Sequence, residues 1–308
     1  MKKIIGIFLV QNEERFIEQA VLNVLDFCDH LILVDHQSLD QTLPILQRLG
    51  DLYPEKISLH QIQNSKESHQ LLQPFVGTDT WVFGIDGDEL YDPKGLISFR
   101  YRILSGEFNE EWMVLGNVLH VDALFENSTA EAHSAVAPIL ASSNVNDTLS
   151  RCMKEAQGTA PSTANLERGL RNQQFHFASG YFSPPSRSIT KLYNFAAITA
   201  WNGKTVERLH GGDPQFRTGF HEQKKRLLQY EYSWEKSPLR CLHLCFLKRS
   251  SVELAEQRQN IMEINAGRRM GFFKRIARAL FRLPEPASWK EQHYQRGERY
   301  VIDATPFF

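Results

Sequence analysis

Three short apolar runs and one segment of alternating apolar and polar residues lie within the first ninety residues of the chain, and polar or amphipathic segments separate them. Such patterns are typical of strands. The apolar runs lie at residues 4–10, 31–34 and 81–85, and the alternating segment lies at residues 57–62. The continuity of the first run predicts a central parallel strand that is covered on both faces.

Two helices are predicted between these strands. Apolar residues recur at helical spacing from Phe16 to Leu25 and again from Leu43 to Leu49, where Asp40 can cap the helix. The alternation of strand and helix predicts an α/β fold with a mostly parallel central sheet flanked by helices.

The pattern after residue 95 gives fewer elements. One strand is expected over residues 111–121, with Gly116 and Asn117 interrupting it, and another over residues 188–193. Between them, residues 127–180 are rich in Ser, Ala, Asn and Thr and have weak periodicity, which predicts an irregular insert. Residues 239–247 form a last apolar strand or helix that contains one histidine.

A basic segment at residues 267–284 differs from everything before it. No acidic residue interrupts its six basic residues, and phenylalanine, isoleucine and leucine recur at about helical spacing. Such a helix suits the surface of an anionic membrane. It suits equally a helix that packs its apolar stripe on the main domain and leaves its arginines in water, because both arrangements use the same stripe.

Composition narrows the class of protein. The formal net charge of the 308 residues is −1, which argues against a dedicated nucleic-acid binder. Four cysteines without C-x-x-C spacing indicate reduced thiols. The N-terminal apolar run imitates a signal peptide, but it is short and no small-residue cleavage site follows it. We expect a cytoplasmic protein.

Polar side chains follow three of the predicted strands. Asn12 and Glu13 follow the first strand, Asp35 ends the second, and the motif Asp86-Gly87-Asp88-Glu89 ends the fourth. Ligands of open α/β sheets bind beyond the carboxyl ends of the strands. Acids around a glycine, which allows close backbone approach, suit a hard divalent cation. The alternative is an acidic turn that caps a following helix.

Three segments together resemble family 2 glycosyltransferases of the GT-A fold: residues 7–17, 32–42 and 85–90. Within that family the chain is similar to bacterial enzymes that decorate lipopolysaccharide and other surface glycans. The resemblance covers residues 1–95 well and the remainder loosely. It implies transfer with inversion from a nucleotide-diphosphate sugar, with a UDP-sugar as the leading donor, to a glycan or lipid-linked acceptor.

The resemblance also implies a metal, Mn²⁺ or Mg²⁺, and roles for individual residues. Asp88 and Asp86 would hold the metal, with the late histidine His243 as a further ligand in preference to His210 and His221. The residues expected to bind the nucleotide sugar are Val10, Asn12, Glu13, Asp35 and Asp86. A lone histidine on an apolar face is also common in plain cores, so both interpretations of His243 stay open.

Residues 200–211 resemble the second half of the family, where an aromatic-plus-glycine turn leads to an acid. Glu207 is therefore the candidate general base that would deprotonate the acceptor hydroxyl. The family often has histidine immediately before this acid, whereas this chain has Val206, and a surface pair with Arg208 is the alternative. Trp201 is a candidate to stack on an acceptor sugar or, alternatively, a core residue.

The expected organisation is a GT-A-like catalytic domain over residues 1–250 and a helical, basic C-terminal appendage over 251–308. Within the domain we expect a nucleotide-binding half at 1–95, an acceptor-side insert within 100–190, and a second half at 190–250.

Three other functions stay open. A nucleotidyltransferase would need a glycine-rich basic loop after the first strand, but residues 11–14 are acidic. A carbohydrate-binding or scaffold protein that lost catalysis would have no need of the Asp86/Asp88 pair. A membrane-associated partner protein would depend on residues 267–284.

Overall fold

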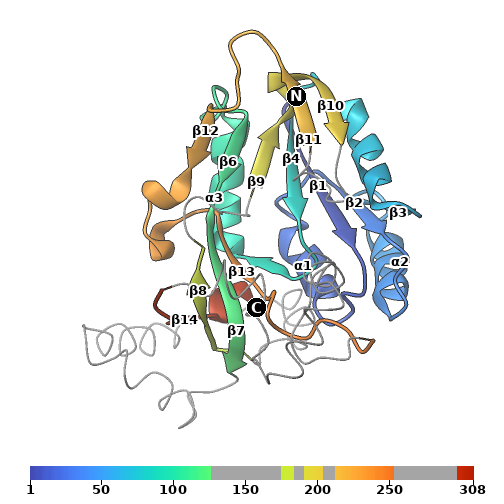
Figure 1. Cartoon of the computed structure of the whole chain (residues 1–308), viewed down its shortest axis with the longest axis vertical. Coiled ribbons are helices and arrows are strands. Elements are labelled where there is room, and N and C mark those ends of the chain that lie inside the picture. The colour runs from blue at the N-terminus through green and yellow to red at the C-terminus, as the bar shows by residue number, and fades with distance from the viewer. Residues whose placement is uncertain (126–174, 184–190, 204–211, 253–296) are drawn as a thin grey trace, which may run out of the picture.

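The structure is a computed structural model, and it describes five stretches of the chain: residues 1–125, 175–183, 191–203, 212–252 and 297–308. Figure 1 shows a mixed α/β molecule in which the first parallel strands fan out on one side and a second sheet lies below and beside them. The expected basic helix at 267–284 and most of the expected insert at 127–180 lie outside these residues.

Seven strands form the larger sheet, in the order β12-β6-β9-β4-β1-β2-β3. The strands β4, β1, β2 and β3 pair with one another in parallel, whereas β9 runs antiparallel to both β4 and β6, and β12 is parallel to β6. Their bounds are Lys3–Val10 (β1), His30–Asp35 (β2), Ile57–Gln61 (β3), Thr80–Ile85 (β4), Met113–Leu115 (β6), Lys191–Asn194 (β9) and Lys225–Leu227 (β12).

Both faces of the parallel strands are covered, which explains their continuous apolar runs. Ile4 and Phe8 of β1 belong to one buried cluster together with the helices, whereas Ile5 and Ile7 belong to a second cluster that includes Leu72. Alternate residues of a strand point to opposite faces, so an uninterrupted apolar run is what two covered faces require.

Three α-helices are described: α1 (Ile17–Val24), α2 (Thr42–Leu52) and α3 (Pro93–Leu104). The first two lie where the periodicity predicts helices. Asp40 does accept a hydrogen bond from the Thr42 amide at 2.9 Å, although the helix itself begins one residue later than a direct cap would place it, after Gln41. Five 3₁₀ segments are also described: Ser65–Phe75, Phe195–Ala197, Leu228–Tyr230, Trp234–Lys236 and Thr305–Phe307.

A second sheet of five strands has the order β14-β8-β7-β13-β5. Its strands are β5 (Glu89–Tyr91), β7 (Asn117–Phe125), β8 (Phe177–Phe182), β13 (Arg240–His243) and β14 (Tyr300–Asp303). A separate antiparallel pair consists of β10 (Ile198–Gly203) and β11 (Gly212–Phe216).

The single strand expected over residues 111–121 is wrong. The chain forms β6 in the first sheet, passes through Gly116, and continues as β7 in the second sheet. A Cβ atom on Gly116 would lie 2.0 Å from the backbone oxygen of Leu239, so only glycine allows the two backbones to approach this closely. The glycine therefore marks the point where the chain changes sheets.

The last residues of the chain belong to the second sheet, whereas most of the predicted appendage at 251–308 lies outside the described residues. β14 pairs antiparallel with β8. Phe307 is 1% exposed and its ring lies nearly parallel to that of Trp234 at a centroid distance of 5.9 Å. The second sheet therefore holds the C-terminal residues by both hydrogen bonds and apolar contact.

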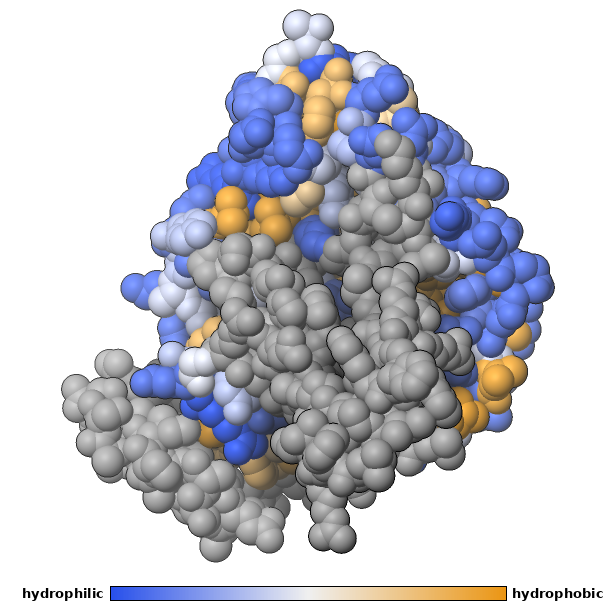
Figure 2. All heavy atoms as spheres, viewed as in Figure 1, coloured by the Kyte–Doolittle hydropathy of each residue, from blue (hydrophilic) through white to orange (hydrophobic). Residues whose placement is uncertain are grey.

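The surface shown in Figure 2 is largely hydrophilic where it is described, with apolar residues in small groups. Of the helices that the structure describes, none is long and apolar enough to cross a membrane. Cys28, Cys241 and Cys245 are buried and form no disulfide among the described residues, and Cys152 lies outside those residues.

Candidate metal and nucleotide site

The carboxyl ends of β1 and β4 meet at Gly87. The two strands are parallel, and a Cβ atom on Gly87 would lie 3.0 Å from both the Val10 side chain and the Glu13 side chain. A larger residue would push these side chains away, so glycine keeps the acidic turn close against the end of β1.

The motif Asp86-Gly87-Asp88-Glu89 forms a tight turn after β4. The Glu89 amide donates to the Asp86 backbone oxygen at 3.1 Å, and the Asp86 amide donates to the Glu89 carboxylate at 3.1 Å. Asp88 is fully buried, and its backbone oxygen accepts from the Leu244 amide at 2.8 Å. The turn is thereby fixed to the chain that follows β13.

Glu89 differs from the other two acids of the motif. It begins β5, is fully buried, and accepts a hydrogen bond from the Tyr91 hydroxyl at 2.6 Å. Burial, together with the charge of Glu89, raises the pKa of Tyr91 well above its usual value, so this hydroxyl stays a donor. Glu89 therefore supports the turn, while Asp86 and Asp88 are left to form the site.

The strand β13 brings His243 to the acidic turn. His243 is paired in register with Glu89 on one side and with His120 on the other. Its Nε2 lies 3.4 Å from the Asp88 carboxylate. Donor atoms of Asp86, Asp88 and His243 all lie within 4.8 Å of one another. The tertiary structure thus brings together the three residues that the sequence predicts as metal ligands.

Two carboxylates and one imidazole suit a divalent cation such as Mn²⁺, which accepts oxygen and nitrogen ligands, and the carboxylates also suit Mg²⁺. Asp86 is half-buried whereas Asp88 and His243 are buried. Asp88 and His243 would therefore hold a cation from the buried side, and a ligand would reach the cation from the more exposed side, near Asp86.

The protonation of His243 is set by its neighbours. Burial alone would lower its pKa, but the charges of Cys245 and Asp88, with the hydrogen bonds to them, raise the pKa of His243 well above its usual value. These neighbours therefore favour the protonated ring, which can donate toward Asp88. A metal ion would have to displace that proton.

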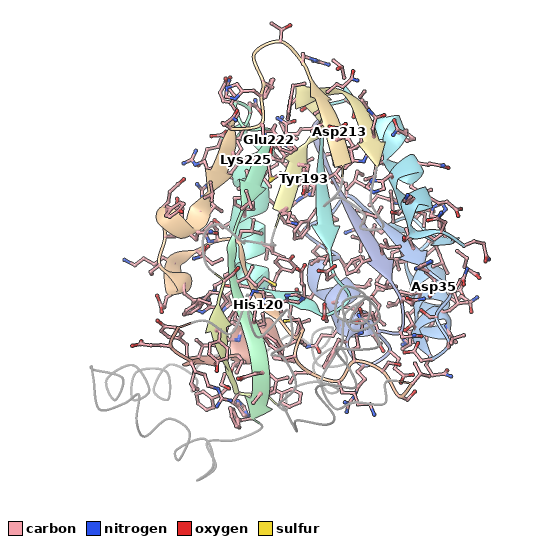
Figure 3. All side chains as sticks on the ribbon, viewed as in Figure 1. Asp35, His120, Tyr193, Asp213, Glu222 and Lys225 are labelled. Atoms are coloured by element: carbon pink, nitrogen blue, oxygen red, sulfur yellow. The ribbon has the colours of Figure 1, made fainter. Side chains whose placement is uncertain are left out.

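His120 and Cys245 are the residues that the sequence analysis missed. The Nδ1 atom of His120 lies 3.2 Å from Nδ1 of His243 and 3.5 Å from the sulfur of Cys245. Figure 3 shows His120 on β7 beside the parallel strands. A lone histidine inside an apolar strand was the available signal, but nothing in the local pattern connects residue 120 to residue 243.

Asp35 lies at the end of β2, opposite Val10 of β1 in register. It is 2% exposed, and one carboxylate oxygen accepts from the Ser38 amide at 3.3 Å. The other oxygen, Oδ1, is buried and has no hydrogen-bond partner among the described residues. A buried carboxylate oxygen needs a donor, and a ligand at this strand end would supply one. The residue lies away from His120 in Figure 3.

Asn12 and Glu13 also hold the loops around the strand ends. Asn12 has a left-handed backbone conformation, with φ of 56°, and its side-chain oxygen accepts from the Leu39 amide at 2.7 Å. Glu13 is 3% exposed and forms an ion pair with Arg249, which the sequence analysis missed. Both residues therefore hold neighbouring segments in place, whatever else they bind.

The segment after β13 is tied to the first loops by a second acid. Asp40 accepts from the Ser250 hydroxyl at 2.5 Å and from the Glu14 amide at 3.3 Å. Burial would raise the pKa of Asp40, but these hydrogen bonds and those from Thr42 outweigh it and hold the pKa below its usual value. Residues 249–252 are thus fixed beside the ends of β1 and β2.

Trp201 lies in the second apolar cluster and is 2% exposed. Its indole nitrogen donates to Nδ1 of His69 at 3.1 Å, and its backbone oxygen accepts from Gln73. This position favours the core interpretation, and a contact with an acceptor stays a prediction. His221 is exposed and hydrogen-bonded to Gln223, whereas Glu207 and His210 lie outside the described residues.

No protein-family model matches the sequence, and a search of curated proteins found no match. Among solved structures, the chain is similar to TarS residues 1–349 of S. aureus in complex with UDP, with 16% identity, a TM-score of 0.32, and coverage of 64% of this chain and 48% of that one.

Two further solved structures are similar to the chain. Mannose-6-phosphate isomerase from Helicobacter pylori has 12% identity, a TM-score of 0.29, and coverage of 40% and 53% of this chain and that one. Glucosyl-3-phosphoglycerate synthase from Mycobacterium tuberculosis, in complex with Mn²⁺, UDP and glucosyl-3-phosphoglycerate, has 18% identity, a TM-score of 0.26, and coverage of 39% and 44%. The chain spans about half the length of these proteins, and similarity at this level establishes neither a family nor an activity.

Proposed function

We propose that the chain is a metal-dependent glycosyltransferase of the GT-A type, similar to family 2 enzymes, which transfers a sugar with inversion from a nucleotide-diphosphate donor. The observation that carries the proposal is the convergence of Asp86, Asp88 and His243 within 4.8 Å, next to the strand end that carries Val10. A cation site at the carboxyl ends of parallel strands is where such a donor would bind.

Asp88, Asp86 and His243 would hold Mn²⁺ or Mg²⁺, which supplies neutralisation of charge on the leaving diphosphate. Val10, Asn12, Glu13 and Asp35 would line the nucleoside side. The Asp35 Oδ1 atom, buried and without a partner among the described residues, is suited to accept from a base N–H or a ribose hydroxyl.

Glu207 is proposed as the general base that takes the proton of the acceptor hydroxyl as that oxygen attacks the sugar carbon from the face opposite the diphosphate. Trp201 is proposed on the acceptor side. The acceptor would be a glycan or a lipid-linked glycan, reached in the cytoplasm or at the inner face of the membrane, with residues 267–284 as the membrane contact.

The first test is the thermal unfolding midpoint of the purified protein with UDP, GDP, CDP and dTDP, each with and without Mn²⁺. Ligand at a hundred times its dissociation constant stabilises by about 2.7 kcal/mol, which moves the midpoint by several degrees. We expect one nucleotide, with UDP as the leading choice, to shift the midpoint only when Mn²⁺ is present.

Asp88→Asn should remove the metal-dependent shift, whereas Asp51→Asn, on the exposed side of α2, should retain it. Transfer or hydrolysis of the corresponding nucleotide sugar should follow the same pattern. The proposal fails if no nucleotide shifts the midpoint and no nucleotide sugar is consumed in the presence of metal.

A further inference from the structure

The cluster of His120, His243 and Cys245 has no part in the proposed transfer, apart from the shared His243. The three side chains come from the neighbouring strands β7 and β13 and from the residues that follow β13. All three are buried, with exposed fractions of 0%, 8% and 1%. Buried polar groups need hydrogen-bond partners or a bound ligand, so these three side chains either bond to one another or bind a common ligand.

The distances within the cluster match those of a tetrahedral metal site. In a zinc site, two nitrogen ligands lie about 3.3 Å apart, and a nitrogen and a sulfur ligand about 3.6 Å apart, given the usual bond lengths. Here the two Nδ1 atoms of His120 and His243 lie 3.2 Å apart, and Nδ1 of His120 lies 3.5 Å from the Cys245 sulfur. All three donor atoms lie within 4.8 Å of one another.

We propose that His120, His243 and Cys245 form a second metal site, which binds Zn²⁺ or a similar cation that prefers imidazole and thiolate ligands. The donor set distinguishes it from the acidic site, because thiolate and imidazole favour zinc over Mg²⁺ and Mn²⁺. On binding, the Cys245 thiol and Nδ1 of the protonated His243 ring each lose a proton to solvent, and each ring keeps its remaining proton on the nitrogen that faces away from the metal.

The surroundings of His243 support this assignment. Histidine ligands of zinc usually direct their second ring nitrogen at a carboxylate, which fixes the orientation of the ring. Nε2 of His243 faces the buried Asp88 at 3.4 Å, while its Nδ1 faces His120. Asp88 would thus orient the zinc ligand through Nε2.

The two sites share His243 and therefore compete. A neutral imidazole has one lone pair available for a metal, on Nδ1 or on Nε2. Zinc bound through Nδ1 leaves a proton on Nε2, which then points at Asp88 and withdraws the imidazole from a cation held by Asp86 and Asp88. Zinc should consequently weaken binding of Mn²⁺ at the acidic site.

The alternative is a hydrogen-bonded chain without metal. Nδ1–H of His243 would donate to Nδ1 of His120, the Cys245 sulfur would lie in contact with the same nitrogen, and Nε2 of His243 would donate to Asp88. This arrangement satisfies the same short distances. A direct measurement of metal binding distinguishes this hydrogen-bonded chain from the proposed metal site.

Cobalt(II) alone is the decisive probe, because a bound thiolate gives it a charge-transfer absorption that oxygen ligands do not. We would titrate the reduced, chelator-treated full-length protein with Co²⁺ and then with Zn²⁺. One equivalent should develop the thiolate band, and Zn²⁺ should remove it.

Variants identify the ligands. Loss of outer-shell partners costs roughly ten- to a hundredfold in metal affinity, so Cys245→Ser and His120→Gln should each weaken binding at least about a hundredfold and abolish the band. Cys28→Ser changes an equally buried thiol that lies close to Gly6 of β1 and is not one of the three proposed ligands, so it should leave the spectrum unchanged. Asp86→Asn should also keep the thiolate band, while it removes a ligand of the acidic site.

The proposal is overturned if wild-type protein shows no thiolate band at saturating Co²⁺, or if Cys245→Ser keeps both the band and the affinity. Should Cys245→Ser fail to fold, His120→Gln decides instead: a loss of Co²⁺ affinity supports the site, and unchanged affinity refutes it. Neither result depends on nucleotide binding, so this test is separate from that of the proposed transfer.

Discussion

The two sheets differ in how far apart in the chain their paired strands lie. In the parallel part of the first sheet, β1, β2 and β3 follow one another and pair with their immediate predecessors, with one helix in each connection. The second sheet instead pairs residues 89–91 and 117–125 with β13 at 240–243, and residues 177–182 with 300–303. The parallel part of the first sheet can be predicted from local sequence patterns, because each strand–helix–strand connection is short and each of its elements has its own apolar periodicity.

The candidate sites lie where these regions meet. The parallel strands contribute Asp86 and Asp88, and the second sheet contributes His120 and His243. Loop closure over long stretches costs conformational entropy that many contacts must offset together, so the second sheet forms only when the whole set assembles. Mutations where the two sheets meet should therefore lower the free energy of unfolding more than comparable mutations within either sheet.

The largest effect is expected at the point where the chain changes sheets. Gly116→Val would place its side chain against the Leu239 backbone, where even a Cβ comes within 2.0 Å, so the free energy of unfolding should fall by about 3 kcal/mol or more. Gly50→Ala in α2 is the matched control, because nothing lies within 4 Å of its Cβ and the helix should gain about 0.5–1 kcal/mol. Urea denaturation measures both, and equal stability of the two variants would refute a special role for residue 116.

A smaller effect is expected at an ion pair that holds β13 to the start of α3. Arg240 of β13 donates to the Asp92 carboxylate at 2.8 and 3.0 Å, and Asp92 also accepts from the Lys94 amide at the start of α3. The two side chains are only 15% and 9% exposed, so Arg240→Met should leave a poorly solvated carboxylate and lower the free energy of unfolding by about 2 kcal/mol.

Arg48→Met removes an exposed pair with Glu18, whose side chains are 44% and 34% exposed, and should cost less than about 1 kcal/mol. Thermal unfolding of the two variants side by side gives the comparison. If both midpoints move equally, burial of the Arg240–Asp92 pair does not increase its contribution to stability.

The smallest effect is expected at Asp40 and depends on pH. The Asp40 carboxylate accepts hydrogen bonds from the Glu14 amide, the Thr42 amide and the Ser250 hydroxyl. Asp40→Asn replaces one carboxylate oxygen with an NH₂ group that cannot accept, so the free energy of unfolding at pH 7 should fall by about 1 kcal/mol. The folded-state pKa of Asp40 is held below its usual value, so its contribution is fully present above about pH 4, the unfolded value, and is lost as the pH falls through the lower folded pKa.

The difference between wild type and Asp40→Asn should therefore be constant above about pH 5 and shrink in acid, measured by urea denaturation across the pH range. Asp51→Asn on the same helix-bearing segment should show no such dependence. A difference that grows on acidification would contradict a folded-state pKa of Asp40 below its usual value.

The sequence alone determined the strands β1 to β4, the helices α1 and α2, and the acids at their ends, because each of these features is a local pattern of apolar periodicity followed by a polar turn. It also singled out Asp86, Asp88 and His243. Their convergence could not be read from the chain, since it depends on the register between β13 and β5.

Only the tertiary structure decided how the chain divides at Gly116, where residues 300–308 pack, and which neighbours His243 has. These outcomes depend on pairing between segments more than a hundred residues apart, as with His120 and His243, for which a local pattern carries no information. From the sequence, His243 looks like an ordinary core residue. In the structure it lies between the Asp88 carboxylate and the Cys245 thiol, and these two neighbours decide what its ring can bind.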